Sequence, residues 1–376
     1  MKSEWTKMKL SDIADFNPRE TIKKGEIAKK ISMDVLRPFY RDVPYYTEEC
    51  FSGGTKFRNG DTIMARITPC LENGKTAQVS ILNDGEVGFG STEYIVFRAK
   101  KGIADKDYLY YLVCSPEVRE PSIKSMVGSS GRQRVQTDVV KNLKIDVPPL
   151  VEQERIGSFL RLIDDKIALN DKINNNLEQQ VSILYQSWFE DFEITNGVCP
   201  EDWSYQELSS IADIASGKRP PVKSNVCNQE TPVSIVGAAS VMGFTSEANH
   251  TDKILVTGRV GTHGVVQRFN TPCWTSDNTL VITSPYYEFT NQILHRIDYS
   301  SMNRGSTQPL ITQGDMKKVV VLVPDEDTLA KFEEFAGSLM VKWEANNKEN
   351  VKLASLRDTL LPKLMSGELD VSNIEI

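Results

Sequence analysis

The sequence predicts an α+β protein in which two sheet-rich globular domains form a tandem internal repeat and are separated by two long helices packed as an antiparallel coiled coil. Two stretches of about 40 residues each carry the apolar spacing that is typical of a coiled-coil seam. The two globular segments also repeat each other, although more faintly. Finally, the globular segment between the helices is compact and bridges an antiparallel pair more easily than a parallel one.

The first globular domain is expected at residues 1–148. It starts with a short strand or turn that leads into a first helix, followed by a loop at 37–46 that is rich in proline and aromatic residues. The remaining runs are bounded by Gly, Asn and Ser and have the composition of short strands, apart from one short helix. We expect strands at 61–68, 77–82, 93–98 and 143–147, a helix at 106–114, and a polar loop at 128–136.

The first long helix is expected within residues 149–195 and covers 150–191. Apolar or tolerated residues recur at alternate spacings of four and three, which is a coiled-coil seam. Pro148 and Pro149 mark its start, and Gly197 and Pro200 lie beyond its end. The seam residues are Ile156, Leu160, Ile163, Ile167, Asn170, Asn174, Leu177, Val181, Leu184 and Trp188.

The second globular domain, residues 196–325, repeats the order of the first. Its opening segment matches that of the first domain 198 residues earlier, with Trp203, Leu208 and Asp213 in the places of Trp5, Leu10 and Asp15. A Gly/Pro-rich loop at 216–226 follows. We expect strands at 253–260, 264–268, 278–283 and 319–323, a helix at 289–297, and a polar loop at 305–313.

The second long helix is expected within residues 326–376 and repeats the seam of the first helix 176 residues later. Even the polar positions recur, since Asn346 and Asn350 match Asn170 and Asn174. A buried asparagine in a seam lowers stability and is best explained as a device that sets the register. The alternative is a solvated patch on an ordinary surface helix. Pro362 is expected to kink or stop this helix.

The lengths of the segments favour an antiparallel pair. Each helix spans roughly 60 Å, whereas a compact domain of about 130 residues has a radius of gyration near 14 Å and neighbouring ends. Such a domain bridges the adjacent ends of antiparallel helices more easily than the distant ends of parallel ones. We therefore expect one domain at each tip of the coil.

Composition limits the possible classes of protein. The chain has a net charge of −7, of which +4 lies in residues 1–148 and −5 in residues 149–195. An acidic chain is a poor DNA binder alone, so DNA binding requires a partner or locally concentrated positive charge. The sequence has no run of 18 apolar residues and no signal peptide. It therefore favours a soluble cytoplasmic protein that does not bind a membrane. The six cysteines are scattered, so we expect neither a metal site nor a disulfide framework.

No catalytic motif is present. The sequence lacks a GxxxxGK[ST] phosphate loop, GxGxxG after a strand, HExxH and GxSxG. Asn17-Pro18-Arg19 lacks the aromatic residue that an adenine methyltransferase would stack on a flipped base, so we interpret it as a turn. We therefore expect no catalytic residues and no cofactor in this chain.

The duplicated loops supply side chains of the types that can read base edges in DNA. Reading a base edge requires Arg, Lys, Asn, Gln, Ser or Thr on a rigid frame. The alternatives are ordinary turns, ion pairs for Arg66 and Arg259, and a loop-stabilising role for His263. The candidates are Arg66, Thr68, Ser91, Thr92, Glu93, Arg132, Gln133 and Arg134 in the first domain, and Arg259, Thr262, His263, Thr275, Ser276, Asn278, Ser306, Thr307 and Gln308 in the second.

The stretch at 148–156 reads PPLVEQERI, the first helix later reads LEQQVSILYQSWF, and a looser second copy ends in LLPKLMSGEL. With these motifs the whole chain resembles the specificity (S) subunit of a type I restriction-modification system. The globular segments then resemble target recognition domains, and the helices the central and distal conserved regions.

The resemblance implies a subunit without catalytic activity. Each recognition domain would read one half of a split double-stranded DNA target, and the helical pair would set the length of the unread spacer. Two methyltransferase subunits, which bind S-adenosylmethionine and methylate adenine, would dock through the helices, with restriction endonuclease subunits outside them.

Two other classes of protein compete with this interpretation. A coiled-coil scaffold with two protein-binding domains accounts for the acidity and the missing catalytic motifs, but not for the paired Arg- and amide-bearing loops. A methylating enzyme in one chain would have to bind S-adenosylmethionine, and the absent motifs oppose it.

Overall fold

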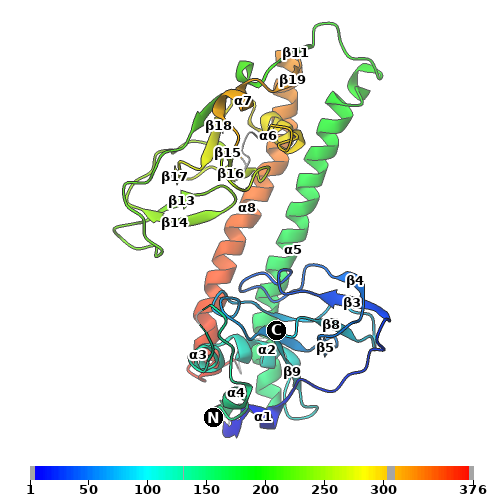
Figure 1. The fold of residues 1–376 in the computed structure, drawn as a ribbon, viewed down its shortest axis with the longest axis vertical. Helices are drawn as coiled ribbons and strands as arrows, with labels where there is room; N and C mark the ends of the chain where they lie inside the picture. The colour runs from blue at the N-terminus through cyan, green and yellow to red at the C-terminus, as the bar shows by residue number, and fades with distance from the viewer. Residues whose placement is uncertain (1–4, 130, 303–309, 372–376) are drawn as a thin grey trace. The chain divides into compact units, whose positions relative to one another are not determined.

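The computed structural model describes residues 5–129, 131–302 and 310–371 (Figure 1). The backbone divides into two compact units. Unit 1 comprises Met1–Lys172 and Asn346–Ile376, and unit 2 comprises Ile173–Ala345. Both boundaries fall inside long helices, so each unit contains one sheet-rich region and a segment of each helix.

The described residues of unit 1 form three small sheets. The strands at its two ends, β1 (Thr6–Lys9) and β10 (Lys144–Val147), pair antiparallel and so close the region into one body. An antiparallel sheet of order β2-β9-β6-β7 consists of β2 (Ala14–Phe16), β9 (Tyr94–Ala99), β6 (Thr62–Ala65) and β7 (Thr76–Gln78). A mixed sheet of order β4-β3-β8-β5 consists of β4 (Thr47–Cys50), β3 (Ile27–Ile31), β8 (Gly88–Gly90) and β5 (Thr55–Phe57).

The helix α2 (Lys106–Cys114) packs deep in unit 1, and its Tyr108 and Tyr111 are almost completely buried. Asp105 caps this helix, because its Oδ1 atom accepts the N–H groups of Asp107 and Tyr108 at 2.9 Å each. Gly157 makes room for the cap, since a Cβ atom there would lie 2.8 Å from the same Oδ1 atom. The other short helices are α1 (Leu10–Ile13), α3 (Pro116–Lys124) and α4 (Thr137–Lys141).

Unit 2 repeats the strand pairing of unit 1. β11 (Ser204–Glu207) pairs antiparallel with β19 (Val320–Val323), as β1 does with β10. The sheet of order β12-β18-β15-β16 consists of β12 (Asp213–Ser216), β18 (Thr279–Thr283), β15 (Ile254–Gly258) and β16 (Gln267–Phe269). The sheet of order β14-β13-β17 consists of β14 (Val241–Thr245), β13 (Val233–Val236) and β17 (Cys273–Thr275). The internal repeat is therefore present in the fold.

The helix α6 (Tyr287–Arg296) takes the place of α2 but is capped differently. Its N-cap residue, Tyr286, offers no side-chain hydrogen bond. Instead, Glu333 of the second long helix accepts the N–H groups of Glu288 at 3.1 Å and Phe289 at 2.8 Å. Glu333 lies 176 residues after Gly157, at the matching place in the repeat. The remaining short helices of unit 2 are η1 (Glu193–Thr195), η2 (Leu208–Ser210) and α7 (Gln313–Lys317).

The long helices α5 (Leu150–Phe189) and α8 (Glu326–Met365), green and orange to red in Figure 1, run antiparallel within each unit. In unit 1, Asp164 of α5 bonds Arg357 of α8, and Asn170 bonds Asn350, so the numbers rise on one helix as they fall on the other. In unit 2, Asn174 bonds the Trp343 carbonyl oxygen and the Phe189 ring packs on Phe332, with the same sense. The antiparallel arrangement is confirmed.

The seam asparagines are buried, at most 8% exposed, and therefore do not form a solvated patch. Asn170 Nδ2 donates to Asn350 Oδ1 at 2.9 Å, and Asn350 Nδ2 donates to Asp171 Oδ1 at 2.9 Å. Asn174 Nδ2 donates to the Trp343 carbonyl oxygen at 3.4 Å, and Asn346 is 1% exposed. A role in setting the register stays a prediction.

Two details of the helices differ from expectation. Tyr185 and Phe189 are buried at the end of α5, whereas the predicted seam residues Leu184 and Trp188 are only partly buried. α8 also continues through Pro362 to Met365, so the helix does not stop at Pro362, and a kink there stays a prediction. Because Pro362 lies in the last turn, only a few residues follow the hydrogen bond that proline removes. No helix in residues 5–129, 131–302 and 310–371 is long and apolar enough to cross a membrane.

Candidate nucleic-acid interface

Three loops of unit 1 meet at one junction, which we call junction 1 and define by Arg66–Thr68, Ser91–Glu93 and Gln133–Val135. The Arg66 N–H group donates to the Glu93 carbonyl oxygen at 2.9 Å, and the Val135 N–H group donates to the Arg66 carbonyl oxygen at 2.8 Å. The Thr68 N–H group donates to the Gln133 carbonyl oxygen at 3.0 Å. Backbone bonds thus bring together candidates that are far apart in the sequence.

Unit 2 contains the same arrangement, which we call junction 2 and define by Arg259–Val260, Ser276–Asn278 and Leu310–Ile311. The Arg259 N–H group donates to the Asn278 carbonyl oxygen at 2.8 Å, and the Ile311 N–H group donates to the Arg259 carbonyl oxygen at 3.0 Å. Arg66 and Arg259 are therefore equivalent, as are Glu93 and Asn278. The backbone hydrogen bonds are the same at these positions in both halves.

The arginines of junction 1 surround a carboxylate. Arg134 donates to both Glu93 carboxylate oxygens, with the shortest contact, 2.7 Å, to Oε1, and Arg66 Nε lies 3.6 Å from Oε2. The hydrogen bonds from Arg134 lower the pKa of Glu93, so this side chain is ionised at neutral pH. The alternative that Arg66 forms an ion pair is thus correct, although the pair lies on the half-buried surface of the junction.

Junction 2 has no such carboxylate at the equivalent place. Arg259 forms no side-chain hydrogen bond or ion pair with the described residues, and its Nε atom is buried. The Nδ1 atom of His263 lies 3.1 Å from the Gly258 carbonyl oxygen, while its Nε2 atom is buried without a partner in the described part of the chain. Asn278 is exposed. The exposed amide of Asn278 therefore keeps hydrogen-bonding capacity that a ligand can use.

The remaining candidates fall into three groups. Thr92, Arg132 and Thr262 are exposed, and Ser91 is half-buried with its Oγ atom accepting the Glu93 N–H group at 3.1 Å. In contrast to expectation, Thr275 and Ser276 are at most 1% exposed, because they lie where the strand packs into the core, and this leaves no side-chain surface for a base edge. The candidates that lie outside the described residues are Ser306, Thr307 and Gln308.

Two basic residues at junction 2 were missed in the sequence analysis. Lys218 and Arg219 are exposed in the loop after β12. The Lys218 N–H group donates to the Thr275 carbonyl oxygen at 2.9 Å, which anchors this loop beside the Ser276–Asn278 turn. The adjacent basic residues Lys218 and Arg219, between Gly217 and Pro220, are the sequence pattern that indicates nucleic-acid contact, although the segment is expected above only as a loop.

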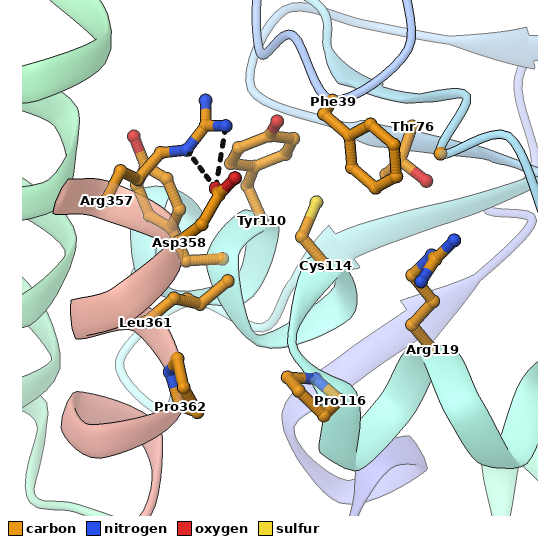
Figure 2. Close-up of a pocket in the computed structure, with 12 residues that line it drawn as sticks. Phe39, Thr76, Tyr110, Cys114, Pro116, Arg119, Arg357, Asp358, Leu361 and Pro362 are labelled. Atoms are coloured by element: carbon orange, nitrogen blue, oxygen red, sulfur yellow. Dashed lines mark hydrogen bonds and ion pairs between the residues drawn. The ribbon is translucent and has the colours of Figure 1, made fainter. Parts of the chain in front are cut away.

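A pocket of about 260 Å³ in unit 1 is lined by residues of α2, α3 and the end of α8 (Figure 2). Burial raises the pKa of the Cys114 thiol in this pocket to about 12, so the thiol is protonated at neutral pH. Asp358 accepts hydrogen bonds from Arg357, at 2.9 Å from Nε and 2.8 Å from Nη2. The residues that line the pocket thus provide no activated nucleophile and no histidine base. Elsewhere in the described part of the chain, no group of three or more His, Cys, Asp or Glu residues could hold a metal ion.

The chain resembles known DNA specificity subunits in sequence. A family model, the type I restriction modification DNA specificity domain, matches residues 2–179. The chain is 22% identical over 469 aligned residues to the type I restriction enzyme HindI specificity subunit of Haemophilus influenzae, covering 98% of this chain and 100% of that subunit. It is 25% identical over 313 residues to the MjaIX specificity subunit of Methanocaldococcus jannaschii, covering 73% and 71%.

A solved structure has a similar fold. The S subunit of a type I restriction-modification system from M. genitalium matches with a TM-score of 0.57 at 16% identity, covering 97% of this chain and 99% of that one. At this identity the likeness supports the fold, namely two sheet-rich regions and two long helices.

Proposed function

Because the chain belongs to the family of type I restriction-modification specificity subunits, we propose that it reads a bipartite DNA target and directs adenine methylation, and restriction, by partner subunits. The observation that supports this proposal most strongly is the repeated junction, which holds an arginine and a planar polar side chain at the same backbone positions in both units. Such side chains on a rigid frame are what base reading requires.

The proposed recognition domains are residues 1–148 and 196–325, and the helices at 149–195 and 326–376 set the spacing between the half-sites. The chain is non-catalytic in this proposal. Methyltransferase subunits, two per specificity subunit, supply S-adenosylmethionine and the chemistry, and restriction endonuclease subunits join them. Because its proposed target is DNA inside the cell, we propose that the protein is cytoplasmic.

The proposal is tested by mapping methylated adenines in DNA from cells that express this chain with its methyltransferase partner. We expect one target with two defined halves and an undefined spacer. Replacing residues 1–148 by another recognition domain should change one half only. If the exchange altered neither half, or both, the assignment of one half-site to each domain would be wrong.

A protein scaffold without DNA binding remains the alternative for comparison. A salt titration separates the two functions, because neutralising phosphates makes DNA affinity fall steeply with salt concentration. The assembled complex should show this dependence on duplex DNA, whereas a scaffold would show none with or without its partner.

A further inference from the structure

The equivalent residues Glu93 and Asn278 differ in chemistry although their backbones are held in the same way. Each carbonyl oxygen accepts the N–H group of the junction arginine, Arg66 at 2.9 Å and Arg259 at 2.8 Å. Each residue ends the turn before the central strand of its sheet, β9 or β18. Their side chains are therefore presented at matching places, and any difference in what they bind arises from the side chains themselves.

A carboxylate at a DNA-facing junction is unsuited to phosphate contact, because like charges repel. Glu93 is ionised and is therefore an acceptor only, which matches the exposed amino groups of cytosine and adenine in the major groove. It does not match guanine or thymine, whose groove edges present acceptors. Arg66 and Arg134 flank this carboxylate and shield it from the phosphates.

Capacity for a further hydrogen bond remains on Glu93. Its Oε1 atom accepts the two shortest contacts from Arg134, at 2.7 and 2.9 Å, whereas Oε2 accepts one at 3.0 Å and lies 3.6 Å from Arg66 Nε. The arginine fork also fixes the carboxylate plane, so little side-chain freedom is lost on binding. The side chain of Glu93 is 23% exposed, which leaves an accessible edge.

Asn278 offers a different pattern. Its exposed amide has one acceptor oxygen and an NH₂ donor, and it forms no side-chain hydrogen bond with the described residues. This combination matches the N6 and N7 edge of adenine, which it can bond with two hydrogen bonds.

We propose that Glu93 and Asn278 are equivalent specificity residues, with Glu93 selecting a base that carries an amino group, cytosine or adenine, in the first half-site and Asn278 selecting adenine in the second. This inference rests on the proposed function, because it assigns base contacts within it. Arg66 and Arg134 then act as positioning residues for the Glu93 side chain.

The test uses the full chain assembled with its methyltransferase subunits and a library of randomised duplex DNA, with methylated molecules sequenced. The Glu93→Gln variant should change or relax one base position in the first half-site, with a loss of discrimination of about tenfold or more, and leave the second half unchanged. Asn278→Ala should do the same for one position in the second half. Glu93→Asp keeps the charge and should keep the preferred base while weakening the discrimination.

Glu86→Gln is the matched control, because Glu86 is also an ion-paired glutamate of unit 1, 2.9 Å from Lys29, but lies outside junction 1. It should leave every position unchanged. Failure of Glu93→Gln and Glu93→Asp to alter any position, in complexes that still methylate the wild-type target, would overturn the inference and leave the proposed function intact. If the wild-type complex methylated the library without sequence preference, the proposed function itself would fail.

Discussion

Arg357 and Asp164 form a buried ion pair between the long helices of unit 1, with side chains 9% and 5% exposed. Arg357 Nη1 donates to Asp164 Oδ1 at 2.7 Å, and the Tyr111 hydroxyl donates to Asp164 Oδ2 at 2.6 Å. The pair therefore joins both helices to α2. Its neighbour Asp358 bonds the same arginine but is 60% exposed.

The Arg357→Met variant should lower the free energy of unfolding by about 3 kcal/mol, because it leaves the Asp164 charge buried without its cation. Asp358→Asn is the control and should lower it by less than about 1 kcal/mol, since solvent screens an exposed pair. Urea denaturation followed by circular dichroism measures both. Equal effects of the two variants would show that the buried pair has no special role.

Glu333 should make stability depend on pH. Burial is the main cause that raises its pKa, from 4.5 to about 7, and the nearby charge of Glu288 adds to this, whereas the two backbone N–H groups and Arg268 oppose it. The folded state thus keeps the proton at pH values where the unfolded chain has released it. The contribution of this group to stability is complete below pH 4.5 and is lost as the pH rises from 4.5 to about 7.

Glu333→Gln should remove this contribution to the pH dependence, because glutamine does not titrate. The unfolding temperature should therefore change less with pH between pH 4.5 and about 7 than in the wild type. The neighbouring exposed Glu334 provides the control variant, Glu334→Gln, which should keep the wild-type slope. Thermal unfolding at a series of pH values measures how the unfolding temperature of each variant depends on pH. An unchanged slope in Glu333→Gln would contradict the assignment.

At the residue scale, sequence predicts which side chains gather but not how they pair. The duplication of the loops was enough to align Arg66 with Arg259 and Glu93 with Asn278, as the backbone bonds confirm. The bonds from Arg134 to Glu93 join residues 41 apart and depend on the fold. The burial of Ser276 likewise depends on the packing of a whole sheet, which no local pattern reports.

At the scale of elements, the long helices were the most predictable part. A seam repeated over many turns is a strong periodic signal. α5 begins and ends within two residues of the expected 150–191, and α8 lies within the expected 326–376. The short helix α2 has the expected bounds of 106–114. In contrast, β3, β4, β5 and β8 were missed, because strands of three to five residues that pair with distant partners have no detectable period.

The long helices also carry a prediction about spacing. Inserting one heptad into each helix, after Leu177 in α5 and after Leu339 in α8, should keep the seam and the hydrogen bond between Asn170 and Asn350. Each insertion adds roughly 10 Å, so the unread spacer should grow by about three base pairs. Methylation mapping should show both half-sequences unchanged. A new half-sequence with an unchanged spacer would contradict the role of the coil.

At the scale of the whole molecule, the chain contains a tandem internal repeat, and the sequence alone was sufficient to recognise it. The matched Trp5 and Trp203 illustrate it, because each indole N–H group donates to a carboxylate at the start of a long helix, Glu152 in α5 at 3.2 Å and Asp325 just before α8 at 3.1 Å. The fine structure of the repeat could not be predicted, since the two copies have diverged to satisfy the same backbone groups by different side chains.

That divergence limits which exchanges of the two domains of this chain will fold. The N-terminal turn of α2 is capped by its own Asp105 and needs Gly157 beneath it, whereas the N-cap residue of α6 offers no side-chain hydrogen bond and Glu333 accepts the N–H groups of that turn instead. A transplanted domain with its own capping aspartate would collide with a glutamate on the long helix of the host chain. A transplanted domain without that aspartate would face a glycine, and two backbone N–H groups would be left without an acceptor. Natural or laboratory shuffling therefore has to exchange this single helix residue together with the domain that rests on it.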